Sequence, residues 1–208
     1  SPTTTVITPT HAYVSPTITN QTYTISLIAQ NASGCGTTMT KTVTLFANPL
    51  PGFTFSPKGA CTPFNVTFTN TSLGGTTYKW DLNYSVTATS TNASQTYTNA
   101  PGSGPQSIPV KLIVTNAGGC KDSITDFVTV FAQPLSGFII DSAVCHPKAL
   151  TFTNTSTGAS TYSWNFGSSS SSTLSIPVAT FTNPGSTAQT SITTLNAINL
   201  TGCVHSST

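Results

Sequence analysis

The chain has 208 residues, a formal net charge of +2, and charged side chains at only 5% of its positions. It holds six Lys and four Asp but neither Arg nor Glu, whereas soluble globular proteins are charged at about a quarter of their residues. This composition argues against a freely diffusing cytosolic monomer. The lysines are scattered and form no basic stripe, which argues against nucleic acid as a partner.

Apolar and hydroxyl residues set further bounds on the class of protein. No apolar run approaches the ~18 residues that a membrane span needs, so we expect no span in this segment. Ser and Thr make up roughly a third of the chain, and hydroxyl groups therefore replace charges in keeping it soluble. Regularly placed aromatic residues and alternating Val, Ile and Thr argue against disorder. We expect any targeting signal to lie outside these 208 residues.

The chain repeats itself with a period of about 84 residues. The segment Phe-Thr-Asn-Thr-Ser at 68–72 recurs at 152–156, and Trp80 recurs as Trp164. The repeating unit is therefore expected to be one small domain. The register predicts one complete domain between two incomplete ones, namely 1–48 (the C-terminal part of a domain), 49–133 (complete) and 134–208 (lacking its last strand).

Short alternating segments, separated by Gly, Pro, Asn and Ser clusters, predict strands at residues 64–69, 76–82, 108–115 and 123–131. This pattern is typical of an antiparallel, immunoglobulin-like β-sandwich, and no helical periodicity is present. Around Trp80, the strand period of two places Tyr78 and Leu82 on the same face and the charged neighbours on the other. The segment around Trp164 does likewise, so we expect both tryptophans in the core. The fold class is all-β, as tandem sandwiches in a linear array.

Two proline-containing segments mark the passages between predicted domains. Residues 48–53 read Asn-Pro-Leu-Pro-Gly-Phe, and residues 133–138 read Gln-Pro-Leu-Ser-Gly-Phe. Proline fixes its own backbone torsion, so these joints are expected to be stiff. The expected partners are therefore the neighbouring repeats of the same long chain, with other copies in a fibre as a further candidate.

The cysteines follow the same period. Cys61 and Cys120 are 59 positions apart, and Cys145 and Cys203 are 58 apart. The simplest prediction is one disulfide within each repeat, Cys61 with Cys120 and Cys145 with Cys203, each worth about 4 kcal/mol in the chain-entropy model. Such bonds indicate an oxidising, extracellular setting. Free core thiols and a metal site are the alternatives, and the lack of any CxxC or Cys/His cluster argues against a metal.

The segments around Cys61, Phe68 and Trp80, and their counterparts one repeat later, resemble PKD domains. The likeness is strongest to the disulfide-linked PKD repeats of very large cell-surface proteins of Bacteroidota, including gliding-type adhesins. The family signature is Trp followed by Asp-Phe-Gly-Asp-Gly. Here Trp80 is followed by Asp-Leu-Asn-Tyr and Trp164 by Asn-Phe-Gly-Ser, so both copies depart from it. The resemblance implies β-sandwich modules that extend, display or adhere.

Two short motifs carry a modification hypothesis. Asp-Ser-Ile at 122–124 and Asp-Ser-Ala at 141–143 resemble the Asp-Ser/Thr-aliphatic site of protein O-glycosylation in Bacteroidota. The candidate residues are Ser123 and Ser142. Sugars at these positions would help to solubilise a chain with so little charge.

Residues able to perform catalysis are few and dispersed. Asp122 and Asp126 lie on a predicted strand, where four residues span about 13 Å, and they are expected to decorate a solvent face. The three histidines, His11, His146 and His205, recur at no matching repeat position and are expected in turns or on the surface. The sequence therefore predicts no enzyme activity, no cofactor and no metal site.

An adhesive surface is the remaining kind of site. The tryptophans are poor candidates for sugar stacking because their spacing assigns them to the core. The Thr-rich segments 37–44 and 67–71 could present hydroxyl ladders to a surface polysaccharide, although plain β-propensity also explains them. The leading hypothesis is a structural and adhesive stalk or filament segment of a giant extracellular surface protein. The alternative is an accessory polymer-binding module of a secreted hydrolase.

Overall fold

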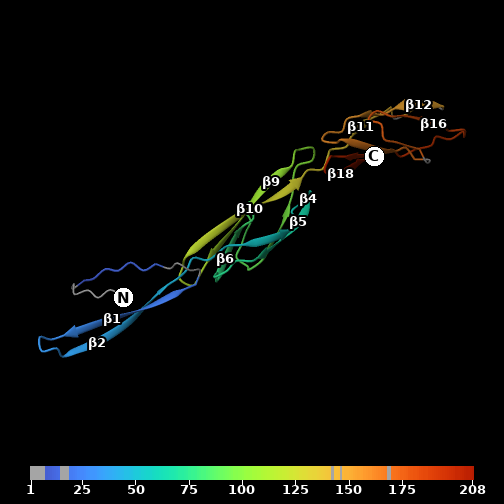
Figure 1. Cartoon of the computed structure of the whole chain (residues 1–208). Helices are drawn as coiled ribbons and strands as arrows, with labels where there is room; N and C mark the ends of the chain where they lie inside the picture. Colours follow the sequence, from blue (N-terminus) through green and yellow to red (C-terminus); the bar gives the residue numbers. More distant parts are fainter. Residues whose placement is uncertain (1–7, 15–18, 142, 146, 168–169) are drawn as a thin grey trace. The chain divides into compact units, whose positions relative to one another are not determined.

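The computed structural model describes residues 8–14, 19–141, 143–145, 147–167 and 170–208. Every regular element in these ranges is a β-strand (Figure 1). None of the residues just named forms a helix that could cross a membrane.

By the proximity of its Cα atoms the chain divides into two compact units. The first comprises Ser1–Thr54, Phe68–Ala93 and Val110–Asp126, and the second comprises Phe55–Thr67, Ser94–Pro109 and Phe127–Thr208. The predicted domain bounds after residues 48 and 133 stay a prediction.

The N-terminal part of the first unit is a long hairpin, blue in Figure 1. Strand β1 (Gln21–Gln30) pairs antiparallel with β2 (Gly36–Leu45), from Gln21 opposite Leu45 to Gln30 opposite Gly36. Because side chains alternate along a strand, one face of the hairpin gathers hydroxyl groups and the other gathers apolar groups.

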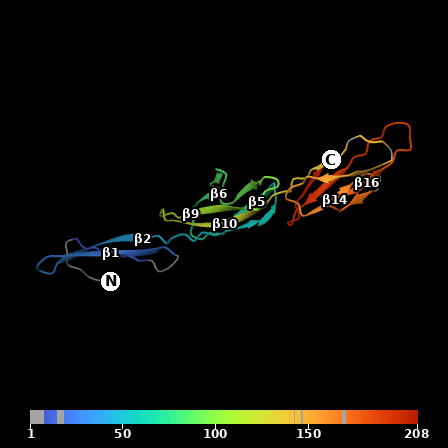
Figure 2. The ribbon, with the colours of Figure 1, turned by 90° about the horizontal axis from the view of Figure 1, so that it is seen from above.

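Two sheets form the middle of the chain (Figure 2). The larger has five strands in the order β4 (Gly59–Cys61), β10 (Lys121–Phe131), β9 (Gln106–Thr115), β6 (Thr77–Asp81) and β7 (Thr87–Ala88). The smaller has three, in the order β3 (Phe53–Ser56), β5 (Phe64–Asn70) and β8 (Ala93–Tyr97). Strand β4 runs parallel to β10, and β6 pairs antiparallel with both β7 and β9.

The two sheets meet through aromatic rings. In the first unit, the Trp80 ring of β6 lies with its centroid 5.3 Å from Phe53 of β3 and 5.8 Å from Phe68 of β5. Trp80 is fully buried, and its indole N–H donates to the carbonyl of Ser90 at 3.1 Å. This contact of the two sheets across an aromatic core makes the fold a β-sandwich.

The C-terminal strands build a similar core within the second unit. Three sheets contribute. Two of them have two strands each, β11 (Phe138–Ile139) with β13 (Thr153–Asn154) and β12 (Lys148–Thr151) with β16 (Val178–Phe181). The third has four strands in the order β15 (Ser171–Ser172), β14 (Thr161–Asn165), β17 (Thr194–Ile198) and β18 (Val204–Ser207). The buried residues are Leu150, Phe152, Trp164, Phe166, Ala179 and Leu195. The Trp164 indole donates to the carbonyl of Leu174 at 2.9 Å, as Trp80 does to Ser90.

The strand and face predictions are confirmed where the structure describes them. The four predicted strands correspond to β5, β6, β9 and β10, with ends that differ by at most two residues. Lys79 and Asp81 are exposed on either side of buried Trp80. The period-two pattern succeeded because a half-buried strand separates its two faces strictly.

The predicted disulfide pairing is wrong. Neither Cys61 with Cys120 nor Cys145 with Cys203 is bonded; instead Cys61 is bonded to Cys203, with their Cα atoms 5.6 Å apart and 142 positions between them in sequence. Both bonded residues belong to the second compact unit. The physical reason is that Cys203 lies in a loop that faces strand β4 of the preceding predicted domain, so proximity in space overrides the shorter spacing in sequence.

Candidate functional site

The two proline joints, defined as residues 48–53 (first joint) and 133–138 (second joint), have the same backbone pairing. In the first, Leu50 and Leu73 exchange two backbone hydrogen bonds of 2.9 Å. In the second, Leu135 and Thr157 exchange bonds of 2.9 and 2.8 Å. A serine hydroxyl supports each joint further, since Ser72 accepts from the N–H of Gly52, and Ser156 accepts from that of Gly137. The joints are therefore hydrogen-bonded segments rather than free linkers.

Three loops of identical design present a cysteine, and we call residues 31–35, 116–120 and 199–203 the cysteine loops. Each begins with Asn and ends with Gly-Cys. In the last of them the Asn199 side-chain oxygen accepts from the N–H of Thr201 at 3.0 Å and of Cys203 at 2.9 Å. The glycine before each cysteine has a φ of 83 or 84°, a left-handed conformation that glycine adopts without strain.

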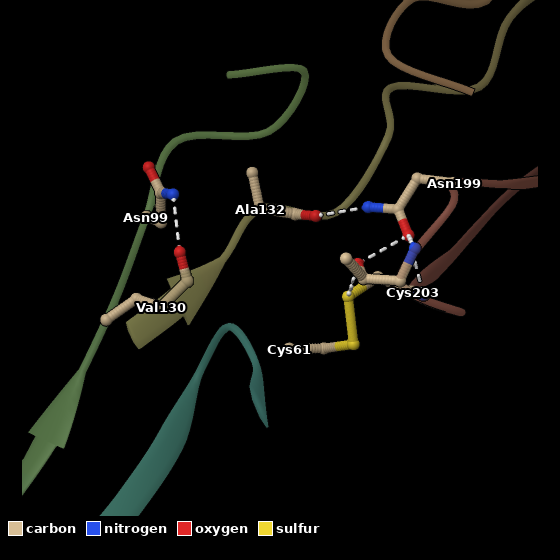
Figure 3. The surroundings of a disulfide bond; sticks show 7 residues. Cys61, Asn99, Val130, Ala132, Asn199 and Cys203 are labelled. Carbon is tan, nitrogen blue, oxygen red and sulfur yellow. Dashed lines mark hydrogen bonds between the residues drawn. A yellow bond between two sulfur atoms is a disulfide. The ribbon is translucent and has the colours of Figure 1, made fainter. Parts of the chain in front are cut away.

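At the second joint the cysteine loop is tied down twice (Figure 3). The Asn199 amide donates to the carbonyl of Ala132 at 2.9 Å, immediately before the joint begins. Cys203, with 1% of its surface exposed, is bonded to Cys61 at the end of β4. Strand β4 is itself held against β10, where the N–H of Thr62 donates to the Phe131 carbonyl at 2.9 Å. The loop is thus fastened by a covalent bond to Cys61 and by a hydrogen bond to Ala132.

A serine–histidine pair adds a third tie at the second joint. The Nδ1 atom of His205 lies 2.7 Å from the Ser136 hydroxyl and accepts from the Ser136 N–H at 3.2 Å. Because this nitrogen accepts from the backbone, it is engaged in holding the joint rather than in activating a nucleophile. His205 was expected to be a surface or turn residue. Sequence reasoning missed the contact because 69 positions separate the two residues and no motif surrounds either of them.

The first joint repeats the asparagine bond of this arrangement within the first compact unit. The Asn116 amide donates to the carbonyl of Ala47 at 2.6 Å. Gly118 lies so close to Phe46 that a Cβ atom at this position would overlap the ring. The half-buried thiol of Cys120 lies 3.9 Å from the Phe46 carbonyl oxygen and is free.

A cleft of about 760 Å³ opens in the C-terminal part of the second unit. Its apolar wall includes Phe138, Ile140, Leu150 and Phe181, and Cys145 lies at its border. One period earlier, Phe55, Val66 and Tyr97 correspond to the last three of these wall residues, and all three are buried. The cleft therefore marks a place where the C-terminal core is less completely covered than its counterpart.

The hydroxyl-bearing segment 37–44 lies on β2, where its side chains are exposed. Thr44, Thr42 and Thr40 stand directly opposite β1 residues that also bear hydroxyls, namely Thr22, Thr24 and Ser26. The side chains of Thr22 and Thr44 lie 3.3 Å apart at their oxygens. Successive pairs are two residues apart along a strand, or about 6.7 Å, which gives a regular, exposed ladder.

The remaining predicted residues are placed as follows. Ser123 is exposed on β10, with Asp122 accepting from its N–H at 2.7 Å, whereas Ser142 and His146 lie outside the described residues. Asp122 and Asp126 both lie on β10. The ring of His11, which is exposed, packs edge-on against Tyr13 at 4.6 Å. In the part of the chain that the structure describes, no three His, Cys or Asp side chains come together as a metal site.

Comparisons with known proteins give a structural likeness but no family. No family model matches the chain, and no curated protein matches it. A solved structure described as "Structural basis for the promiscuous specificity of the carbohydrate-binding modules from the beta-sandwich super family" is similar at 18% identity, covering 70% of this chain and 83% of that chain with a TM-score of 0.36. At that TM-score the likeness carries no argument about this chain.

Proposed function

We propose that this chain is a segment of an extracellular stalk or filament, built from tandem PKD-like sandwiches, that performs no catalysis itself. The observation that carries the proposal is the tie between Cys61 and Cys203, which joins residues on either side of the second joint. A bond of this kind resists separation of the two flanking segments, which is what a module under tension requires. It also supports an oxidising, extracellular setting.

The hairpin supports an array that continues beyond these residues. The apolar face of β1 and β2 exposes Ile25, Leu27, Met39 and Val43. One period later, Val110 and Leu112 of β9 correspond to Ile25 and Leu27 of β1, and both are fully buried. The other sheet of the same predicted domain would cover this face in the same way. Exposed apolar faces of this kind are otherwise an association liability.

Small-angle scattering of the full chain, with and without the bond between Cys61 and Cys203, tests the stalk proposal. We expect oxidised protein to give an extended particle whose maximum dimension is independent of salt, because so few charges are present. Cys203→Ser should broaden the distance distribution, since the joint then keeps only hydrogen bonds. Cys35→Ser is the matched control because Cys35 is free and exposed. A compact particle in every variant would remove the stalk proposal.

The position of the chain in its parent polypeptide is a separate test of this proposal. Peptide mapping of the native polypeptide should show many similar units. Antibodies raised against these 208 residues should label intact, unpermeabilised cells. A catalytic domain flanked by two or three such units would instead make this chain the polymer-handling arm of an enzyme.

A second candidate function, polymer binding, is favoured by the hydroxyl ladder of the hairpin. Exposed hydroxyls in register could hydrogen-bond a polysaccharide that lies along the strands. Replacing Thr40 and Thr42 by Val should then reduce pull-down by insoluble chitin or cellulose at least several-fold. Thr37→Val, on the opposite face of β2, is the control. Equal retention of both proteins would dispose of the ladder as a binding surface.

The O-glycosylation hypothesis belongs to the same extracellular setting. Ser123 is exposed on a strand and is accessible to a transferase in the folded chain. Mass spectrometry of peptides from the native source should show hexose-containing adducts at Ser123 and Ser142. Peptides in which both serines are bare would end the hypothesis.

A further inference from the structure

The cysteine loop 116–120 reproduces the hydrogen bonds of the backbone groups in the loop that carries the bonded Cys203. The Asn116 oxygen accepts from the Cys120 N–H at 2.9 Å, as the Asn199 oxygen does from Cys203. The Asn116 N–H donates to the Cys120 carbonyl at 3.0 Å, and the corresponding bond at Asn199 is 3.1 Å. Cys120 is therefore held in the conformation in which its counterpart forms a disulfide.

The surroundings of Cys120 also correspond to those of Cys203. Asn116 donates to Ala47 immediately before the first joint, just as Asn199 donates to Ala132 immediately before the second. Phe46, whose carbonyl lies 3.9 Å from the Cys120 sulfur, corresponds to Phe131 (131 − 46 = 85). In the second unit, Phe131 is the residue that pairs with Cys61 in the parallel β4–β10 ladder. Cys120 thus lies beside the position against which a β4-like strand would place a cysteine.

Cys145 is the counterpart of Cys61, the other cysteine of the bonded pair. It follows Cys61 by 84 positions, and residues 143–145 correspond to strand β4. Its thiol is free and exposed at the border of the 760 Å³ cleft. In the counterpart core of the second unit, Val128 and Val130 of β10 are fully buried. A continuation of β18 equivalent to these residues would close the cleft and support residues 143–145, as β10 supports β4.

We propose that Cys120 and Cys145 are two halves of further disulfides of the Cys61–Cys203 kind, in a chain where each repeat is bonded to the next. Cys120 bonds the Cys61-type cysteine of a preceding repeat, and Cys145 bonds the Cys203-type cysteine of a following repeat. The array itself belongs to the proposed function, on which this inference rests. The partner in both cases is another segment of the same polypeptide.

Formation of each proposed disulfide is an oxidation, and an external disulfide serves as the oxidant. Two thiols lose two protons and two electrons and form one S–S bond, while a protein or small-molecule disulfide accepts them and is released as two thiols. Exchange proceeds by attack of one thiolate on the external disulfide, followed by displacement by the second cysteine. Both cysteines must therefore be adjacent in the folded array, which is what the repeated loop geometry provides.

An insertion into the full chain tests the pairing directly. A second copy of residues 49–133 is placed after residue 133, and the protein is refolded with oxidised and reduced glutathione. The unmodified chain has five cysteines, one bond and three free thiols. The extended chain has seven cysteines. We expect Cys61 of the first copy to bond Cys120 of the inserted copy, and Cys61 of the inserted copy to bond Cys203.

The readout is the number of thiols that iodoacetamide alkylates without reduction, measured by intact mass. The proposal requires three in the extended chain, because seven cysteines then form two bonds. Five alkylated thiols would show that only the bond to Cys203 forms, and would overturn it. Cys61→Ser in the first copy is the matched control, and it should raise the count from three to four by freeing the inserted Cys120.

Peptide mapping of the unreduced native polypeptide decides the question if the extended chain does not fold. A Cys120 peptide linked to a cysteine peptide of another repeat supports the proposal, and a free Cys120 thiol overturns it. The outcome is separable from the stalk proposal. Disulfides between successive repeats in a polymer-binding protein would contradict only the stalk proposal. An extended particle in which Cys120 is free would contradict only the proposed disulfide pairing.

Discussion

The side-chain amide of Asn199 donates a hydrogen bond of 2.9 Å to the carbonyl of Ala132. Its oxygen at the same time accepts from the backbone of the loop that ends in Cys203. One side chain therefore shapes the loop and fastens it to the chain that enters the second joint. Asn116 and Ala47 have the same relationship at the first joint, at 2.6 Å. The asparagine side chain therefore fixes where the loop presents its cysteine.

Separating the two contributions of Asn199 is the first prediction. Asn199→Asp keeps the acceptor that shapes the loop but removes the donor to Ala132, whereas Asn199→Ala removes both. We expect the alanine variant to cost about 1–3 kcal/mol and to speed hydrogen exchange at the Cys203 amide. The aspartate variant should lower the melting temperature while exchange at that amide stays slow. Equal exchange rates in the two variants would contradict the division of roles.

The disulfide supplies the second prediction. In the chain-entropy model, closing the 142-residue separation between Cys61 and Cys203 contributes about 5 kcal/mol. We expect Cys203→Ser, or reduction with dithiothreitol, to lower the thermal midpoint of the second compact unit by roughly 10–20 °C. Cys120→Ser is the matched control, because Cys120 occupies the equivalent loop position but is free in this chain. An equal loss of stability in both variants would show that the effect lies in the loop and not in the bond.

The sequence was sufficient for the local structure but not for the pairing of cysteines. Alternation around Trp80 and Trp164 identified their strands and buried faces, because a residue that faces a core is selected strictly for apolar character. Spacing could not identify the disulfide. The loop-closure term grows only with the logarithm of length, so replacing a 59-residue separation by 142 changes it by only about 0.8 kcal/mol.

The ties at the joints were hidden for a related reason. The Asn at the head of each cysteine loop was visible as part of a turn, yet its second bond goes to a residue 67 to 69 positions away. The contact between Ser136 and His205 spans 69 positions and likewise involves no motif. Contacts of this kind depend on where the joint places successive segments, which no local pattern records.

The turn after β6 supplies the third prediction. Asn83, Tyr84 and Ser85 have φ values of 69, 51 and 61°, a left-handed run that costs non-glycine residues about 1–2 kcal/mol each. Ser85 is exposed, and glycine at this position would relieve its strain. We expect Ser85→Gly to raise the free energy of unfolding by up to ~1 kcal/mol, after the entropy cost of glycine is subtracted. Chemical denaturation monitored by tryptophan fluorescence measures it.

A control for this substitution lies two residues further along. Thr87 begins β7 and is also exposed, so Thr87→Gly introduces the same flexibility without relieving any left-handed strain. It should lower stability by about 0.5–1 kcal/mol. If both variants lose stability to the same extent, the left-handed run carries no strain in solution.

The apolar face of the hairpin supplies the fourth prediction. Leu27 and Met39 stand directly opposite each other on β1 and β2, and are 65% and 62% exposed. Contiguous apolar surface of this kind drives association when nothing covers it. We expect the 208-residue chain to self-associate at micromolar concentrations, as measured by sedimentation velocity. The double variant Leu27→Lys, Met39→Lys should remain monomeric, because burying either ammonium group against another copy is costly.

Charge alone is controlled for on the opposite face of the same strands. Thr24 and Thr42 are also a directly opposed and exposed pair, so Thr24→Lys, Thr42→Lys adds the same two charges without touching the apolar face. Association should persist in this variant if the apolar face is the contact. Loss of association in both variants would assign the effect to net charge, which rises equally from +2 to +4 in each. Selective loss in the first would identify this face as the surface that the other sheet of the same predicted domain covers in the proposed array.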